Sequence, residues 1–218
     1  MLAFSLADRH HDRLRILCVG AHSDDIEIGC GGTILKLLSQ NESASVDWVV
    51  LGASGERSSE AWQSAERFLS RAREKTIQMK AFRDGFFPYI GGEIKEYFEE
   101  LKESVCPDVI FTHCRHDLHQ DHRLVSELTW NTFRDHLVLE YEIIKYDGDL
   151  GTPNLFVHLD SGQVETKVNY LLDIFRTQRS RPWFGESAFV SIMRLRGLES
   201  NAPCEFAEGF YCRKFIWD

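Results

Sequence analysis

The chain has 218 residues, of which 43% are hydrophobic and 12% aromatic. This is enough for one sizeable core, so we expect a single domain over residues 1–218. Lys and Arg number 25 against 34 Asp and Glu, a formal net charge of -9. That balance excludes a protein that grips the phosphate backbone of nucleic acid through a basic surface.

No apolar run approaches the length of a transmembrane helix. The start of the chain, MLAFSLADRHHDRLR, lacks the basic residues and long apolar stretch of a secretory signal. Six cysteines are scattered without a CxxC pair, and we expect them to be reduced structural thiols. These features predict a cytosolic protein without a membrane span.

Strand-like and helix-like patterns alternate along the first 140 residues. An apolar run that ends on glycine predicts a strand at 14–22, and apolar residues at helical spacing predict a helix at 31–40. A second strand is expected at 45–55, followed by one long amphipathic helix at 58–82. Segment 84–92 contains a proline, which favours a loop or an edge strand.

The rest of the chain continues in the same way. Helices are expected at 93–105, in the second half of 113–135, at 162–178 and at 187–199, and strands at 108–113, 137–146 and 154–160. Strands that alternate with helices form a mostly parallel sheet with both faces covered. The predicted fold class is therefore α/β, a doubly wound, Rossmann-like, three-layer α/β/α sandwich.

Two polar segments follow predicted strands. The first is AHSDDIEIGCGGT at 21–33, and the second is HCRHDLHQDH at 113–122. Ligands of doubly wound sheets bind beyond the carboxyl ends of the strands, so both segments should meet at one edge. They bring together imidazoles and carboxylates that would repel or remain unpaired without a metal: His22, Asp24, Asp25, Glu27, His113, His116, Asp117, His119, Asp121 and His122.

Two imidazoles and one carboxylate can hold Zn²⁺ and leave one position open for water, as catalytic zinc sites do. Simpler explanations exist for each segment alone. Asp24 or Asp25 could cap the next helix, the glycines could form a tight turn or a phosphate-binding nest, and the histidine-rich segment could be a solvated loop. The coincidence of both segments at one sheet edge favours the metal site.

These two segments resemble the signature motifs of the PIG-L/LmbE-like family of zinc-dependent N-deacetylases. AHSDDIEIGCGGT resembles AHPDD followed by an acidic residue and GxGG, and HDLHQDH resembles the family motif HxDH. Ser23 stands where the family most often has Pro, and the acidic residue, Glu27, is displaced by Ile26. The likeness is strong over residues 14 to about 125 and loose over the C-terminal third.

The resemblance implies a role for each matching position. His22, Asp25 and His122 are the implied zinc ligands. Asp24 is the implied general base, and His119 is implied to stabilise the oxyanion and protonate the leaving amine. Asp121 is implied to orient the His119 ring. Glu27 has no implied role, and helix N-terminal charge complementation would explain it equally well.

Other positions are weaker candidates. Arg71 and Glu74 form an RxxE spacing that resembles a substrate-contacting arginine of the family, although an ion pair on a helix surface explains it too; Arg73 is an alternative. Trp183 and Phe184 lie in a predicted loop, and Trp183 is expected to stack on a sugar ring. Glu208, Lys145 and Tyr146 are further candidates for the pocket.

Taken together, the sequence predicts a zinc hydrolase that removes acetyl from an N-acetylated amino sugar, a GlcNAc-type conjugate or glycan precursor. Another divalent metal, such as Fe²⁺, is compatible with these ligands. One alternative is a non-haem Fe(II) enzyme with a facial triad, and another is a sugar-binding module that holds a metal without catalysis. The sequence does not distinguish a monomer from a homo-oligomer.

Overall fold

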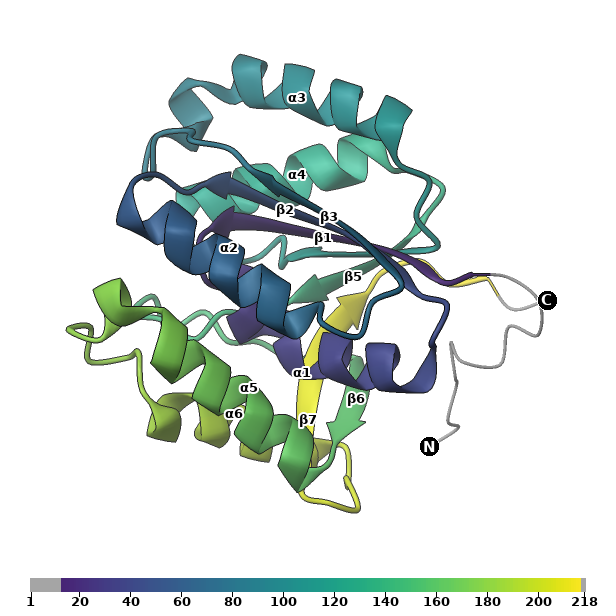
Figure 1. The fold of residues 1–218 in the computed structure, drawn as a ribbon, viewed down its shortest axis with the longest axis vertical. Coiled ribbons are helices and arrows are strands. Elements are labelled where there is room, and N and C mark those ends of the chain that lie inside the picture. The colour runs from purple at the N-terminus through teal and green to yellow at the C-terminus, as the bar shows by residue number, and fades with distance from the viewer. Residues whose placement is uncertain (1–12, 217–218) are drawn as a thin grey trace.

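A mixed, twisted sheet forms the centre of the protein (Figure 1). The computed structural model describes residues 13–216, so most of the segment considered as a secretory signal lies outside the described residues. Within that range the sheet has seven strands: β1 (Arg15–His22), β2 (Ser45–Gly52), β3 (Glu74–Met79), β4 (Val109–His113), β5 (Leu137–Tyr141), β6 (Leu155–Leu159) and β7 (Phe206–Cys212). Their spatial order is β3-β2-β1-β4-β5-β7-β6. Strands β1 to β5 pair in parallel, and β7 pairs antiparallel with β5 and β6.

Helices cover both faces of this sheet (Figure 1). On one side lie α1 (Asp25–Gln40), α2 (Glu56–Phe68), α5 (Ser161–Ile174) and α6 (Glu186–Glu199), and on the other lie α3 (Gly91–Ser104) and α4 (Gln120–Thr132). Successive residues of β1 point to opposite faces: Ile16 and Cys18 join the first core, and Leu17 and Val19 join the second. The predicted three-layer α/β/α fold is confirmed.

Strand order reverses beside β1. The chain passes from β1 to β2 and β3 on one side, then crosses back to add β4 and β5 on the other. The two strands at this switch point end at His22 and His113, so the polar segments that follow them emerge side by side. This is the place where doubly wound sheets bind ligands, and the predicted meeting of the two segments is confirmed.

The long helix predicted at 58–82 is wrong in its second half. Helix α2 ends at Phe68, and residues Glu74–Met79 form β3, which pairs in parallel with β2. Strand β3 is at the edge of the sheet, and its first three residues are exposed. An exposed edge strand needs no continuous apolar run. The mostly polar sequence of β3 therefore looks like a continuation of the amphipathic helical pattern of α2.

The first helix begins six residues earlier than predicted. Helix α1 starts at Asp25, directly after Asp24, so the glycines lie inside the helix and form no turn or nest. One reason for a glycine there is close packing, because a Cβ on Gly29 would collide with the ring of Tyr141. The early start places both aspartates at a helix N-terminus, where the dipole favours negative charge.

A buried ion pair reaches into the backbone of α1 from the C-terminal third. Glu208 on β7 accepts hydrogen bonds from the backbone N–H groups of Gly32 (2.9 Å) and Thr33 (2.6 Å). Lys167 on α5 donates to Glu208 (2.6 Å) and to the carbonyl of Ile28 (2.7 Å). Glu208, predicted as a pocket candidate, is therefore engaged in holding α1 to β7 and α5.

Two further expectations are settled by the structure. The strand predicted at 137–146 ends at Tyr141, and an irregular segment leads on to β6. All six cysteines are free, three of them buried, in agreement with reduced thiols. In residues 13–216 no helix is both long and apolar enough to cross a membrane.

Candidate metal and catalytic site

His22, Asp25 and His122 present one ligand atom each within a small triangle. Nδ1 of His22 lies 3.3 Å from Oδ2 of Asp25 and 3.1 Å from Nε2 of His122, and the last two atoms lie 3.5 Å apart. Ligands about 2.0–2.1 Å from a tetrahedral Zn²⁺ are separated by about 3.3–3.4 Å. All three side chains are buried. The triangle therefore fits a single small divalent metal.

The protonation of two of these groups suits a metal, whereas His22 would release a proton on binding one. Burial would lower the pKa of His22, but the carboxylates of Asp25, Asp121 and Asp84 outweigh burial and raise that pKa well above its usual value. Burial, followed by the charge of His113, lowers the pKa of His122 to about 3, so its ring is neutral. Burial alone would raise the pKa of Asp25, but its interactions with the imidazoles of His122, His113 and His22 outweigh burial and hold that pKa well below its usual range. A neutral imidazole and an ionised carboxylate are the forms that bind metals.

His113 is less suited to be a ligand. Its Nε2 lies 3.2 Å from Oδ2 of Asp25, and it groups with Asp25 and His122 as a second set of metal-ligating side chains. However, the same nitrogen accepts a hydrogen bond from the backbone N–H of Ala21 at 2.9 Å. That bond occupies the lone pair that a metal would need, so His113 supports the site as a packed ring stacked on His122.

Carboxylates hold the outer nitrogens of both ligand imidazoles. Asp117 accepts from Nδ1 of His122 at 2.9 Å, and Lys145 pairs with Asp117 at 3.0 Å. On the other ring, Nε2 of His22 lies 3.2 Å from Asp121 and 3.1 Å from Asp84. Such partners fix the tautomer of a metal-ligating histidine and its orientation. Lys145, predicted at the pocket rim, therefore acts through Asp117.

Asp121 differs from the role that the resemblance implied. Its carboxylate lies near the ring of His119 but its hydrogen bonds go elsewhere, to His22 and to the backbone N–H groups of Gly85 (2.6 Å) and Phe87 (3.1 Å). Only the backbone N–H of Asp121 reaches His119, donating to Nδ1 at 3.2 Å. The reason is the first turn of α4, which directs the Asp121 side chain toward β1.

Asp24 is buried beside the ligand triangle, and its Oδ2 has no hydrogen-bond partner. Burial, followed by the charge of Asp25, raises its pKa to about 6, against the opposing charges of Arg57 and His22. A carboxylate with a pKa near neutrality and a free oxygen can accept a proton at physiological pH.

His119 lies at the entrance to the cluster and is only partly buried. Its ring stacks on His122, with centroids 4.5 Å apart, and meets His22 edge-on at 4.9 Å. Because Asp121 donates to Nδ1, the remaining nitrogen, Nε2, carries the proton of the neutral ring. Burial, followed by the charge of His22, lowers the pKa of His119 below its usual value.

Arg57 and Asp84 belong to the site although they were not identified from the sequence. Arg57, in the first turn of α2, donates from Nε to the Ser23 hydroxyl (3.2 Å) and from Nη1 to Asp84 (2.7 Å). Asp84 connects this guanidinium to His22. Ser23, the departure from the family motif, thus provides the hydroxyl that anchors Arg57. The one available signal was that Arg57 follows the strand predicted at 45–55, whereas Asp84 was expected after a helix and carried no such signal.

Glu27 points into the interior, not toward solvent. It is fully buried, and neither carboxylate oxygen has a hydrogen-bond partner. Burial raises its pKa to about 8, so the side chain is neutral at pH 7. Helix-dipole complementation, which needs a charged carboxylate, does not explain this residue.

Several predicted site residues are not brought to the cluster. Arg71 lies in an exposed turn after α2, and Glu74 opens β3 in register with Ser45, at the start of the strands and the opposite edge from His22. The RxxE spacing is therefore not on a helix, and the structure does not place Arg71 or its alternative Arg73 at the site. His116 is exposed in the loop after β4.

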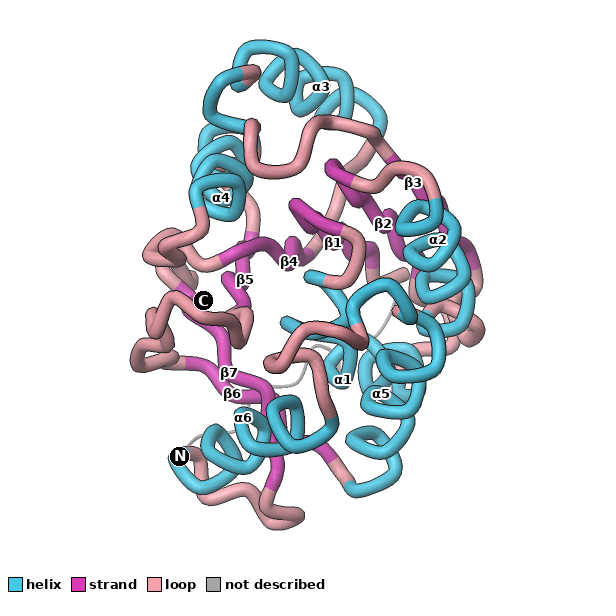
Figure 2. The backbone as a smooth tube through the Cα atoms, turned by 90° about the vertical axis from the view of Figure 1, so that its left-hand side faces the viewer, coloured by secondary structure: helices cyan, strands magenta, loops and turns pink. Residues whose placement is uncertain are grey.

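Trp183 lies in the segment between α5 and α6, which passes across the carboxyl edge of the sheet (Figure 2). Its ring meets Phe184 edge-on at 5.7 Å, and Phe184 is buried in the core. Trp183 itself is only partly buried. The contact of Trp183 with a sugar stays a prediction.

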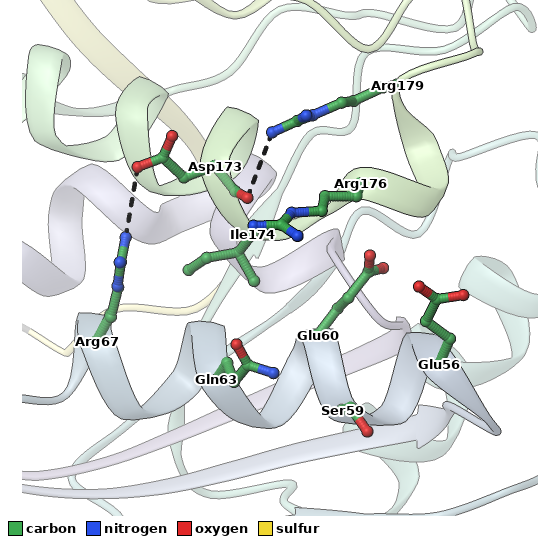
Figure 3. Close-up of a pocket in the computed structure, with 9 residues that line it drawn as sticks. All are labelled: Glu56, Ser59, Glu60, Gln63, Arg67, Asp173, Ile174, Arg176 and Arg179. Atoms are coloured by element: carbon green, nitrogen blue, oxygen red, sulfur yellow. Dashed lines mark hydrogen bonds and ion pairs between the residues drawn. The ribbon is translucent and has the colours of Figure 1, made fainter.

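A cavity of about 560 Å³ lies apart from the cluster, between α2 and the end of α5 (Figure 3). Its charged residues largely satisfy one another: Arg67 pairs with Asp173 at 3.6 Å, and Arg179 donates to the Asp173 carbonyl. Glu60 is engaged by the backbone and hydroxyl of Thr177. None of the predicted metal ligands or catalytic residues lines this cavity.

The fold and the cluster define a protein that can hold one divalent metal at the switch point of a doubly wound sheet. The chain matches the family model described as PIG-L, GlcNAc-PI de-N-acetylase, over residues 17–133, more than half of its length. It belongs to this family. A comparison with curated protein sequences gives no match.

Solved structures share the fold at low sequence identity. The conserved protein TT1542 from Thermus thermophilus is 21% identical, with a TM-score of 0.74 over 94% of this chain and 97% of that one. N,N'-diacetylchitobiose deacetylase from Pyrococcus horikoshii is 20% identical, with a TM-score of 0.66 over 95% and 86%. The 4-carboxy-2-hydroxymuconate hydratase of Pseudomonas putida is 17% identical, with a TM-score of 0.72 over 94% and 98%.

Proposed function

We propose that the protein is a zinc-dependent N-deacetylase that hydrolyses the acetamide of an N-acetylated amino sugar, a GlcNAc-type conjugate or glycan precursor. The observation that carries the proposal is the ligand triangle of His22, Asp25 and His122 with the unpartnered oxygen of Asp24 beside it. Family membership supports the reaction class.

In this proposal each residue has one task. Zn²⁺ held by the triangle supplies Lewis acidity, which lowers the pKa of water to about 7 and polarises a carbonyl. Asp24 takes a proton from the attacking water through its free Oδ2. His119 in its protonated, imidazolium form would donate a proton to the sugar nitrogen as the carbon–nitrogen bond breaks, which releases acetate and the free amine and leaves the neutral ring. Asp117 and Asp121 keep the two ligand imidazoles in place.

Two residues extend the site beyond the reacting atoms. The charge of Arg57 acts on Asp24, and its guanidinium is hydrogen-bonded to Ser23 and Asp84. We assign it the positioning of the polar substrate, in place of Arg71. Trp183 is proposed to stack on the sugar ring from the segment between α5 and α6.

The metal and the compartment belong to the same proposal. One Asp and two His suit Zn²⁺, while Fe²⁺ can bind the same set. Six free cysteines are typical of a reducing compartment, and we propose that the protein acts in the cytosol. Nothing in the cluster requires a second metal.

The test is a panel of N-acetylhexosamine conjugates incubated with zinc-loaded protein, with acetate and free amine measured in the same samples. We expect both products in equal amounts, and Asp24→Asn should form both about 10²- to 10⁴-fold more slowly. Because a hydratase shares this fold, acetate must be the readout. Sugar binding without acetate release from any conjugate would contradict the proposal and favour a sugar-binding module.

A further inference from the structure

A five-residue turn after β5 brings a buried ammonium group beside the metal cluster. The turn runs from Lys145 to Asp149, and the side chains of these two residues pair with each other. Gly148 has a φ of 63°, a conformation that favours glycine and turns the chain back so that the pair can close. The two side chains are 9% and 6% exposed, so the ion pair lies in the interior although the tip of the turn is exposed.

The ammonium of Lys145 is shared by two buried carboxylates. Its Nζ lies 3.0 Å from Oδ2 of Asp117 and 2.5 Å from Oδ2 of Asp149. Carboxylates that contact the same nitrogen repel each other once its positive charge is removed, and a buried charge that loses its partner is left uncompensated. The positions of both carboxylates therefore depend on Lys145.

Asp117 uses both of its oxygens on the cluster. Oδ2 accepts a hydrogen bond from Nδ1 of His122 at 2.9 Å, and Oδ1 accepts one from the backbone N–H of His119 at 2.8 Å. The first bond orients an imidazole of the ligand triangle, and the second fixes the chain at the N-cap of α4. One carboxylate therefore sets the positions of two functional histidines.

Asp149 ties the same segment to the turn at a second point. Its Oδ2 accepts a hydrogen bond from the backbone N–H of Leu118 at 2.7 Å, and Leu118 directly precedes His119. Asp147, the other acid of the turn, is 40% exposed and lies 4.0 Å from the ammonium, where an ion pair contributes little. The two buried ends of the turn thus hold two consecutive residues of the histidine-rich segment.

Stability of the fold is the simpler explanation for this arrangement. A buried ion pair, however, often stabilises a protein no more than apolar side chains of similar size. Lys145 also contacts a carboxylate whose remaining bonds all go to the cluster segment. Partners of this kind orient the ligands of metal sites and tune their affinity.

We propose that Lys145 is a positioning residue of the metal site. It holds Asp117 in the orientation in which that carboxylate bonds both the proposed ligand His122 and the backbone of the proposed acid, His119. Asp149 fixes the backbone beside them. The effect on metal binding is independent of the reaction that the protein catalyses, whereas the effect on turnover rests on the proposed function.

Zinc affinity gives the first test, measured by competition with a chromogenic chelator. Lys145→Met keeps the length of the side chain but removes its charge and donors, and zinc should bind about tenfold more weakly, the lower end of the usual loss, because Asp117 remains. Lys145→Arg, which keeps the charge and donors, should restore most of the affinity. Lys145→Gln replaces Lys145→Met if the latter does not fold.

The matched control is Lys36→Met. Lys36 is also partly buried, and it donates to the backbone carbonyl of His158 in β6, so this variant should bind zinc as the wild-type protein does. Unchanged affinity in Lys145→Met, or an equal loss in Lys36→Met, would overturn the proposal.

Cobalt-loaded protein gives a readout that a loss of stability alone would not move. The visible absorption bands of Co²⁺ depend on the geometry of its ligands, so Lys145→Met should shift them and Lys145→Arg should return them to the wild-type positions. A lower unfolding temperature of Lys145→Met with unchanged bands would reduce the ion pair to a structural role and overturn the proposal.

The two acids of the turn are compared by amide hydrogen exchange in the zinc-loaded protein. Asp149→Ala removes the acceptor of the Leu118 N–H, so exchange at Leu118 should accelerate about tenfold or more. Asp147→Ala, one turn position away, should leave that exchange rate unchanged. Equal rates in the two variants would contradict the role of Asp149.

Turnover connects the inference to the proposed function. With zinc at saturation, Lys145→Met and Asp149→Ala should lower kcat for acetate release about 10- to 100-fold with KM unchanged, because the proposed acid is displaced. Wild-type kcat in both variants would overturn the effect on His119. If no conjugate releases acetate, the proposed function fails, yet zinc affinity and the cobalt bands still decide the role of Lys145.

Discussion

Oδ2 of Asp121 lies 3.2 Å from Nε2 of His22, on the opposite side of the imidazole from the nitrogen that meets Asp25 and His122. A proton on Nε2 is thereby held between ring and carboxylate, which leaves the Nδ1 lone pair for a metal. We therefore propose that Asp121 positions the proposed ligand His22, although it neighbours another proposed ligand, His122, in sequence.

Asp121→Asn should weaken zinc binding by about 10- to 100-fold, the usual cost of removing a carboxylate that orients a ligand histidine. Competition with a chromogenic chelator measures the affinity. Asp160→Asn is the matched control, because Asp160 caps α5 away from the site and Asn is an equally good cap. Unchanged zinc affinity in Asp121→Asn would contradict this role.

His22→Ala, Asp25→Ala and His122→Ala should each lose bound zinc and activity together, because one missing ligand of three weakens the whole chelate. His113→Ala should retain zinc, since its Nε2 is occupied by the backbone of Ala21. Elemental analysis of the purified variants decides the point. Full zinc occupancy in His122→Ala, together with loss of zinc in His113→Ala, would make His113 the ligand in place of His122.

Asp24→Asn should keep zinc and fold but lose turnover by about 10²- to 10⁴-fold, the usual contribution of a general base. Asn matches Asp in size and cannot accept a proton. In the wild-type protein the raised pKa of Asp24, about 6, predicts that activity falls as the pH drops through that value, because the base becomes protonated. Near-normal turnover with zinc retained would remove Asp24 from this role.

Arg57→Gln should move the acid limb of the kcat/KM profile to higher pH. The charge of Arg57 favours the ionised form of Asp24 and lowers its pKa, so removal of that charge raises the pKa further. Arg67 lies on the same helix and pairs with Asp173 away from the site. The control variant Arg67→Gln should therefore leave the acid limb in place. A limb that stays fixed or moves down would show that Arg57 does not act on Asp24.

Glu27→Gln should change how stability depends on pH in the metal-free protein. In the folded state Glu27 keeps its proton up to about pH 8, whereas the unfolded chain releases it above about 4.3. Its contribution to the free energy of unfolding is therefore full below that lower value and is lost as the pH rises through 8. The substituted amide cannot ionise, so the variant should gain stability relative to wild type across this range.

Urea unfolding at several pH values measures this effect. Glu165→Gln, an exposed position on α5, provides the control and should follow the wild-type protein. A difference between Glu27→Gln and wild type that is independent of pH would mean that Glu27 is ionised in the folded state.

The parts of the site that could be predicted from sequence are those that directly follow buried strands. His22, Asp25 and His122 stand after or near the ends of β1 and β4, where an apolar run changes to clustered polar residues. The fold class followed from the same alternation. Roles within the cluster were harder, because the turn that aims Asp121 at His22 leaves no mark in residue spacing.

The prediction of a helix where β3 lies is the largest error in the predicted fold. It also explains why Asp84 was not identified as part of the site. The first half of β3 is exposed, so EKTIQM has neither the apolar run of a buried strand nor a break from the helix before it. With β3 hidden, the loop after it could not be placed, and Asp84 was an ordinary loop residue. Arg71 was in turn assigned to a helix face that does not exist.

The Lys167–Glu208 pair bears on how the chain can be divided. The family match ends at residue 133, yet the helix that begins with Asp25 has its backbone at Ile28, Gly32 and Thr33 bonded to side chains from α5 and β7. A fragment cut at the family boundary would leave those contacts unmade beside the ligands. The signature and the tail are thus one inseparable unit, and the C-terminal third cannot be exchanged between relatives without a substitute for both members of the pair.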